Sequence, residues 1–530
     1  MKKIYLMITA LALIFSSGCK KYLDVNVDPA TPQDVDIKNL TAPLFAQMHR
    51  GVAFDSRWLG CVIQNWGYRT TGFVGDVHGW TTASDNMGEI WRTNYYGLGG
   101  NLSLIMDGAT KNEEYNYLGM AQSLRAWSWQ ITTDYHGDII LKQAFEPNRY
   151  VFDYDPQPAV YAEVLRLIEE SNKNLLRADS KGTVARLALG DLVYKGDVTK
   201  WVKFNYGILA RNLNNQINKA TYDPDKVIAA VDKSLASNAD NFLIPLAGTN
   251  TTNGNFFGPL RGNLNSYRQS RFMVGLLNGQ FFTGTPGAVI DPRITTMLTP
   301  SNDGQYRGTQ AGIGDPAGTA AALPTAIPNP WGSIGLNDAT PSPGAGNGKY
   351  LFRDNSNFPV MTYSEMQFIK AEAAFRKGDL PTAHTAYLNG ISASIDFVSA
   401  LGALTVPSTA ITTANKTAYM TSASVQQTPA TLTLKDIMLQ KYISMYGHAF
   451  VETWSDLRKY HYVTGDSKGN NPYAGSFALP TTLFGDNGGK PIQRYRPRYN
   501  SEYLWNLASL KTVGGDKADY HTYPVWFSEP

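Results

Sequence analysis

The sequence has little cysteine and almost no charge imbalance. Only Cys19 and Cys61 occur in 530 residues, and the formal net charge is +3. Without a basic excess, the chain lacks the electrostatic signature of a nucleic-acid-binding protein, so no nucleic-acid partner is expected. Cys61 lies in an apolar stretch with no group that would lower its pKa, which favours a buried thiol over a nucleophile. We expect no disulfide bond.

Motifs for catalysis and for cofactors are also missing. The chain has no Gly-x-Ser-x-Gly turn, phosphate-binding loop or dinucleotide fingerprint. His448 and Glu452 are one helical turn apart but lack the second histidine of a zinc protease. We therefore predict a protein that is not an enzyme, with no catalytic residues, no cofactor and no metal site. A glycosidase stays open, because its two carboxylates come together only in the folded chain.

The first residues have the order of a lipoprotein signal. Lys2 and Lys3 precede an apolar run over residues 4–15, which ends in Ser-Gly-Cys at Cys19. The run is too short for a permanent membrane span. This pattern predicts a signal peptide over residues 1–18 and a lipid on Cys19.

The rest of the chain reads as a tether followed by one domain. Residues 19–43 form a polar lead that suits a lipidated N-terminal tether. No linker rich in charge or serine divides residues 44–530, which predicts a single domain. Glycine and proline gather at about residues 245–360, so we expect a loop-rich insertion there.

A helical pair is predicted between Met361 and Phe397. Gly378 ends the first helix, Asp379 caps the second, and Pro381 fits the first turn of that second helix. The pair resembles one tetratricopeptide unit. Such a unit buries its apolar face only against others, so the sequence predicts an all-α fold of stacked helical pairs. Apolar periodicity predicts further helices over residues 117–136, 158–176, 201–217, 224–235 and 435–460.

Aromatic residues in glycine-rich loops are the first candidates for a binding site. Trp66, Tyr68 and Trp80 stand in such loops, as does Phe73, and flat rings there can stack on a sugar ring or a peptide side chain. A role in the hydrophobic core is the alternative for these rings. Directional hydrogen bonds would come from neighbouring polar residues, among them Asp76 and Asn86.

The central loops supply a second set of candidates. Arg261 and Tyr267 precede a helix expected to start near Ser270. Trp331 lies between a proline and a glycine in a loop of small residues, which suggests an exposed ring available to a ligand or partner.

Charged residues near the end of the predicted 435–460 helix suggest a structural network. Glu452 and Asp456 are one turn apart, and Arg458 and Lys459 follow them. We expect this network to connect the helix to the segment 494–498.

Three long stretches resemble the SusD/RagB family of nutrient-binding outer-membrane lipoproteins. They are YLGMAQSLRAWSWQITTDYHGDIILKQAF from Tyr117, DLVYKGDVTKWVKFNYGILARNLNNQ from Asp191, and KDIMLQKYISMYGHAFVETWSDLRKY from Lys435. The resemblance implies a SusD-like fold: tetratricopeptide-like helical pairs with a large irregular, loop-rich half that binds the ligand. It also implies a cell-surface lipoprotein, anchored in the outer membrane, beside a SusC-like TonB-dependent barrel.

Three functional hypotheses follow. In the first, the protein captures an oligosaccharide, or a peptide, and delivers it to the SusC-like transporter. In the second, it is a lipid-anchored glycan hydrolase. In the third, it is an assembly subunit that binds only protein. The predicted ligand-binding residues are Trp66, Tyr68, Asp76, Trp80, Asn86, Arg261, Tyr267 and Trp331.

Overall fold

The computed structural model describes residues 35–317, 322–334 and 348–530. The predicted signal peptide, Cys19 and most of the predicted tether lie outside these ranges. Helix α2 (Ile37–Val62) begins at a cap in which the Asp36 side chain accepts a hydrogen bond from the Lys38 amide. Residues 37–43 therefore belong to the folded body, and the predicted boundary at residue 43 is wrong.

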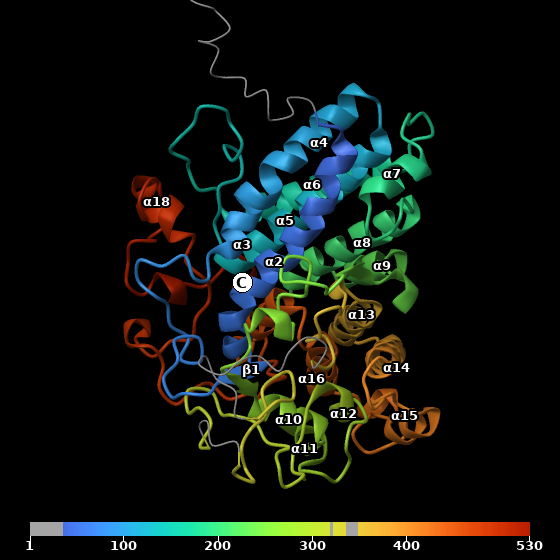
Figure 1. Cartoon of the computed structure of the whole chain (residues 1–530), viewed down its shortest axis with the longest axis vertical. Coiled ribbons are helices and arrows are strands. Elements are labelled where there is room, and N and C mark those ends of the chain that lie inside the picture. The colour runs from blue at the N-terminus through green and yellow to red at the C-terminus, as the bar shows by residue number, and fades with distance from the viewer. Residues whose placement is uncertain (1–34, 318–321, 335–347) are drawn as a thin grey trace, which may run out of the picture.

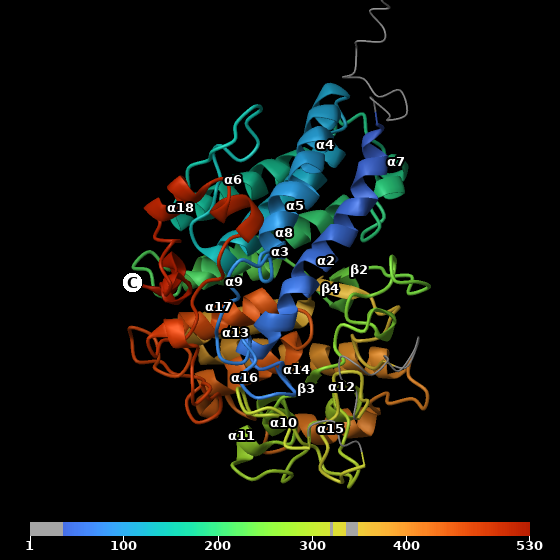
Figure 2. The same ribbon diagram turned by 60° about the vertical axis from the view of Figure 1, so that its left-hand side comes forward.

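Helix α2 passes obliquely through the molecule, from the helical half to the loop-rich half (Figures 1 and 2). Its buried side includes Leu44, Phe45, Met48 and Val52, at the spacing of one helical face. This face belongs to the main hydrophobic core, which contains residues from both halves. Helix α2 therefore connects the two halves through the core.

The helical half consists of antiparallel pairs packed on one another, as predicted. Successive helices α5 and α6, α8 and α9, and α13 and α14 form pairs, and α9 also packs on α13. The all-α, tetratricopeptide-like prediction is confirmed. The helices are α4 (Gly100–Lys111), α5 (Tyr115–His136), α6 (Gln157–Leu175), α7 (Val184–Gly190), α8 (Val198–Asn215), α9 (Pro224–Lys233), α13 (Tyr363–Lys377), α14 (Leu380–Gly402), α15 (Thr413–Met420), α16 (Leu434–Met445), α17 (Phe450–Lys459) and α18 (Leu507–Thr512). Within the described ranges, no helix is both long enough and apolar enough to cross a membrane.

The α13–α14 pair follows its sequence signals closely. Gly378 takes the left-handed conformation (φ +87°) that ends α13. The Asp379 side chain accepts a hydrogen bond from the Thr382 amide and caps α14. Inside the pair, an added Cβ at Gly390 would lie 2.9 Å from the ring of Phe368, so glycine permits the close approach of the two helices.

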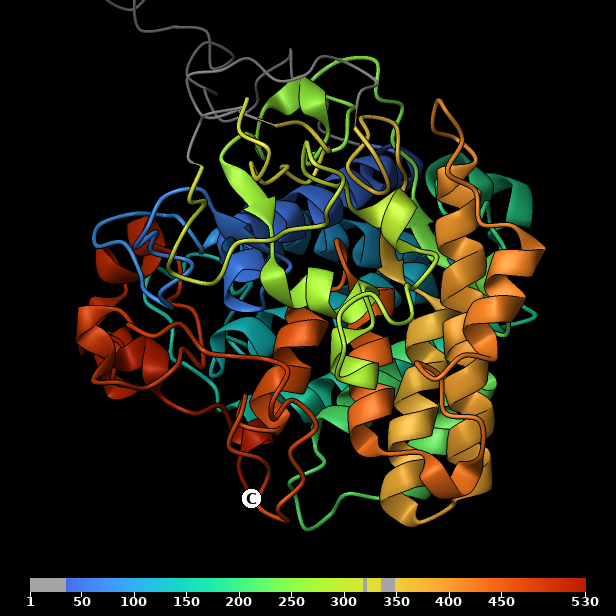
Figure 3. The ribbon, with the colours of Figure 1, turned by 90° about the horizontal axis from the view of Figure 1, so that it is seen from below.

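The loop-rich half contains only short elements. Strands β1 (Trp66–Tyr68) and β3 (Tyr267–Gln269) pair antiparallel, as do β2 (Phe242–Ile244) and β4 (Phe358–Met361). Figure 3 shows this half from below, with its loops spread over the helices. The extent of the insertion at about 245–360 stays a prediction. The short helices are α3 (Glu89–Arg92), α10 (Arg271–Leu277), α11 (Gln280–Thr283) and α12 (Ile294–Met297).

The predicted helix over residues 435–460 is two helices, α16 and α17. The chain turns between Tyr446 and Ala449, where Gly447 has φ +81°. The Gly447 amide donates a hydrogen bond to the Asn65 side chain (2.9 Å), a residue far away in the sequence. This long-range contact stabilises a break that the continuous apolar pattern does not reveal.

Candidate ligand-binding site

Four of the predicted site residues meet around β1 and β3. The rings of Trp66 and Tyr267 are 6.0 Å apart between centroids, and those of Tyr68 and Tyr267 are 5.2 Å apart. Asp76 accepts a hydrogen bond from the Tyr68 amide at 2.9 Å. The structure thus brings Trp66, Tyr68, Asp76 and Tyr267 into one cluster.

Two tryptophans of the predicted set are buried. Trp66 is 0% exposed, and its indole N–H donates to the Arg57 carbonyl at 3.1 Å. Trp331 is 2% exposed, and its N–H donates to the Phe257 carbonyl at 2.6 Å. The expected exposure of Trp331 is wrong, because its loop folds back and places the ring in the core. Neither ring has a free face for stacking in this structure.

The Asp76 side chain holds the backbone of Tyr68 in place. The carboxylate is fully buried, and burial raises the pKa of Asp76 to about 7. Its bond to the Tyr68 amide fixes β1 at the point where the chain leaves the core. In this structure the side chain is not accessible to a ligand.

Tyr68 stacks on Phe73 to form a partly exposed aromatic pair, the Tyr68–Phe73 pair. The ring centroids are 4.0 Å apart with an interplanar angle of 14°. Tyr267, which is buried, meets both rings edge-on. The pair is therefore rigid, and it is the part of the cluster that reaches solvent.

An open pocket of about 590 Å³ lies between α10, α11 and the segment 306–316. This volume is within the range of pockets for small ligands, about 300–1,000 Å³. Ile313 on its wall is 47% exposed. Aliphatic and aromatic side chains alternate with polar ones around it, among them Arg271, Asn278, Gln280, Tyr306, Ile313 and Ile327.

Backbone hydrogen bonds join the pocket wall to the segment that carries the aromatic pair. The Gly72 amide donates to the Gly312 carbonyl at 3.2 Å, and the Asp315 amide donates to the Arg69 carbonyl at 2.9 Å. The Tyr68–Phe73 pair and the pocket wall are thus carried by neighbouring, hydrogen-bonded segments, although neither ring lines the pocket. We call the pair and the pocket together the loop-half site.

The other predicted residues lie outside this cluster. Trp80 is partly exposed, and its indole N–H donates to Asp486 at 3.2 Å. The guanidinium of Arg496 lies 3.8 Å from the centre of its ring. Asn86 is exposed, and Arg261 packs over the ring of Phe256 at 5.7 Å. The structure therefore does not join Trp80, Asn86 and Arg261 to the loop-half site.

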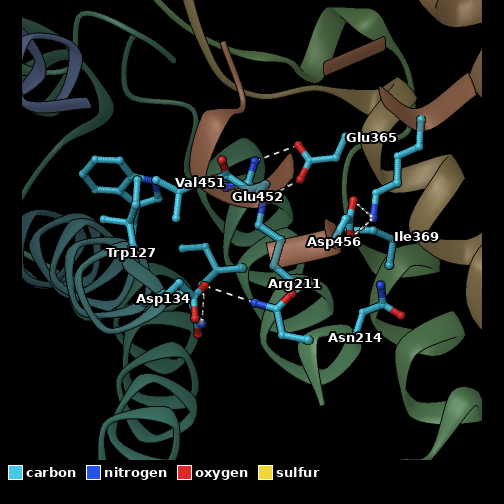
Figure 4. Close-up of a pocket in the computed structure, with 14 residues that line it drawn as sticks. Trp127, Asp134, Arg211, Asn214, Glu365, Ile369, Val451, Glu452 and Asp456 are labelled. Atoms are coloured by element: carbon cyan, nitrogen blue, oxygen red, sulfur yellow. Dashed lines mark hydrogen bonds and ion pairs between the residues drawn. The ribbon is translucent and has the colours of Figure 1, made fainter. Parts of the chain in front are cut away.

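The carboxylates in the helical core form an enclosed ion-pair network rather than an open cleft (Figure 4). Arg211 of α8 bonds to Glu365 of α13 at 2.7 Å and to Glu452 of α17 at 2.8 Å. The cavity between them has a volume of about 20 Å³, room for about one water molecule. A sugar cannot enter a space of that size, so this carboxylate pair gives no support to a hydrolase.

The charge network of α17 has different partners from those predicted. Asp456 pairs with Lys441 and Lys459, each at 2.8 Å, and Glu452 pairs with Arg211. The prediction that the network connects to residues 494–498 is wrong, because this face of α17 packs on α8, α13 and α16. Arg458 donates to the Gln493 carbonyl at 2.8 Å, and α17 meets the segment 494–498 through Trp454, whose ring is 5.2 Å from that of Tyr495.

The fold defines a class of proteins built from stacked helical pairs, with irregular loops over one half. A SusD-like family model, described as "Starch-binding associating with outer membrane", matches residues 32–472. The chain belongs to this SusD-like family. No curated protein matches it.

Solved structures show the same fold at low sequence identity. A SusD/RagB family protein from Bacteroides thetaiotaomicron is 22% identical, with a TM-score of 0.67 over 93% of this chain and 99% of that chain. A chitin-binding protein is 20% identical, with a TM-score of 0.67 over 93% and 100%. A chitin-binding SusD homolog from Flavobacterium johnsoniae is 19% identical, with a TM-score of 0.66 over 93% and 98%.

Sequence reasoning missed most of the pocket. Tyr306 and Ile313 stand in a glycine-rich stretch with no periodicity, so nothing local singled them out. The one usable signal is Gly312-Ile313-Gly314, where an apolar residue between two glycines has no helix or strand to bury it.

Proposed function

We propose that the protein is a surface glycan-binding lipoprotein that captures an oligosaccharide at the loop-half site without breaking it. The observation that carries this proposal is the open pocket on a segment hydrogen-bonded to the one that carries the partly exposed Tyr68–Phe73 pair. A flat aromatic face next to polar side chains suits a sugar, which has an apolar ring face and polar edges. Affinity is limited by the cost of ordering a flexible chain.

The captured ligand is then delivered to a SusC-like TonB-dependent barrel in the outer membrane. Membership of the SusD-like family and the two chitin-binding structural relatives support a glycan over a peptide as the ligand. A lipid on Cys19 would hold the protein at the cell surface. Loss of palmitate labelling in Cys19→Ala tests the anchor, and co-purification of a SusC-like barrel from outer membranes tests the partner.

Calorimetric titration tests the binding step. The purified protein is titrated with hexamers of glucose and of N-acetylglucosamine, and with a mixed peptide library. We expect one glycan to bind, and Phe73→Ala or Tyr306→Ala to weaken it about tenfold, because each removes an aromatic contact at the site. Tyr206→Ala is the matched control, since it removes a partly exposed ring from α8 in the helical half.

Other outcomes would redirect the proposal. Peptide binding without glycan binding would favour the peptide ligand, and shortened glycans in the reaction mixture would favour the hydrolase. If neither glycans nor peptides bind while the barrel still co-purifies, the protein is an assembly subunit.

A further inference from the structure

Helix α18 lies away from α10 and α11 (Figures 1 and 2), and a second group of exposed aromatic side chains is found on the segments around it. The loop that follows α5 and the segment that precedes α18 lie side by side there. The Asn506 side chain joins them, because it accepts from the Phe152 amide and donates to the Phe152 carbonyl, each at 3.0 Å. The exposed apolar residues on these segments and on the helical segment Thr93–Gly99 before α4 are Tyr96, Phe145, Tyr150, Val151, Leu504 and Trp505.

Trp505 is the most exposed tryptophan of the described residues, at 76%. Its amide donates a hydrogen bond to the Ser501 carbonyl at 3.1 Å, so Trp505 lies one helical turn after Ser501. Tyr150 is 82% exposed and comes two residues before Phe152. Single exposed apolar side chains are ordinary, but several of them on segments that also border a pocket indicate a binding surface.

Ser501 and Phe152 both line a pocket of about 210 Å³. Its aromatic part includes Trp91, whose ring is 4.7 Å from that of Tyr95. Its polar part includes the Glu502 carboxylate, which is 4% exposed. The pocket is smaller than those of drug-sized ligands, about 300 Å³ and above, and suits a single ring. The residues around it are Trp91, Arg92, Tyr95, Tyr96, Ile140, Ala144, Phe152, Arg498, Ser501 and Glu502.

The charges around this pocket are already paired within the protein. Arg92 bonds to Glu89 at 2.9 Å, and Arg498 bonds to Asp85 at 2.6 Å. The Glu502 carboxylate accepts hydrogen bonds from two neighbouring side chains, at 2.8 and 2.9 Å. An ionic ligand would have to break these pairs, so the pocket favours an uncharged one that has an apolar face and hydroxyl groups.

We propose that this pocket and the Trp505 ring form a second saccharide-binding subsite, separate from the loop-half site, for uncharged sugar residues. One ring enters the pocket over the aromatic side chains, and a neighbouring ring stacks on Trp505. The inference rests on the proposed function in that it takes the ligand to be a glycan. Two subsites on one protein would hold a long glycan more tightly than either subsite alone.

Oxidative labelling of the purified protein tests the subsite directly. The extent of Trp505 oxidation by a short hydroxyl-radical pulse is measured by peptide mass spectrometry, with and without hexamers of glucose and of N-acetylglucosamine. Trp505 is well suited to this because its ring is open to solvent. We expect at least one hexamer to protect Trp505 several-fold, and to do so equally in the Phe73→Ala variant.

Variants give the second measurement. Trp505→Ala should weaken binding at this subsite about tenfold, Trp505→Phe should restore most of it because a ring remains, and Leu189→Ala, which removes an exposed leucine of α7, should leave it unchanged. If neither hexamer protects Trp505, the subsite is refuted. If a hexamer binds in a Phe73-dependent way without protecting Trp505, the subsite fails while the proposed function stands. If a hexamer protects Trp505 while Phe73→Ala leaves the calorimetric affinity of the protein unchanged, the loop-half site fails and the subsite stands.

Discussion

Replacement of Glu372 should destabilise the fold strongly, because this carboxylate is at the centre of a buried charge cluster. Glu372 is 0% exposed and pairs with Lys459 at 3.1 Å and with Lys441 at 3.3 Å. Asp456 bonds to the same two lysines, so two positive charges face two negative ones. Burial alone would raise the pKa of Glu372, but Lys459 and Lys441 lower it, which keeps the carboxylate charged.

Glu372→Ala leaves two buried ammonium groups with one carboxylate. Breaking a buried ion pair by removing one partner costs about 3–5 kcal/mol of unfolding free energy. The Tyr460 hydroxyl, which donates to Glu372 at 2.7 Å, and the Asn214 amide also lose their acceptor. Urea unfolding followed by circular dichroism measures the loss. Glu169→Ala, which breaks an ion pair in which both side chains are 69% exposed, is the control and should cause no measurable change.

A double substitution tests whether charge balance is the cause. Glu372→Gln combined with Lys459→Met removes one charge of each sign and leaves Lys441 paired with Asp456. We expect the double variant to be more stable than Glu372→Gln alone, since the uncompensated charge is gone. If the double variant loses as much unfolding free energy, relative to the unsubstituted protein, as the two single variants lose together, the argument from charge balance is refuted.

Three further predictions concern buried groups. Trp331→Ala should lower the unfolding free energy by about 3–5 kcal/mol in a urea titration, and an unchanged midpoint would contradict its place in the core. Burial raises the pKa of Asp55 from 3.8 to about 8, so the native state keeps this proton to higher pH than the unfolded state. Stability should therefore fall as pH rises between these values, by at most about 1.4 kcal/mol per pH unit from this group. Asp55→Asn should flatten the slope, and an identical pH profile would refute this assignment. Cys61 is 1% exposed and burial raises the pKa of its thiol, so iodoacetamide should label it only in urea; rapid labelling of the native protein would contradict this.

The sequence predicted those parts of the fold that short-range signals determine. The α13–α14 turn is an example, because Gly378, Asp379 and Pro381 each act within a few residues of their own position. The break between α16 and α17 depends instead on the bond from Gly447 to Asn65, 382 positions away. No periodicity of apolar residues contains that information.

The candidate site was predicted only in part, for the same physical reason. The aromatic and glycine content pointed to the segment of Tyr68 and Phe73, where the structure places a partly exposed aromatic pair. The exposure of each ring is decided by residues distant in the sequence: Trp331 is buried by its bond to Phe257, 74 positions away. Conversely, the exposure of Trp505 arises where two remote segments meet through Asn506 and Phe152. Local composition cannot separate these cases.

Helix α2 connects the start of the described chain to the loop-rich half. Its 26 residues, at about 1.5 Å each, make a rod of about 39 Å. At its C-terminal end the helix packs closely against β1, because an added Cβ at Gly60 would lie only 2.4 Å from the Trp66 ring. The chain therefore enters the folded body at one end of this helix, and the other end packs directly against the strand that carries Tyr68.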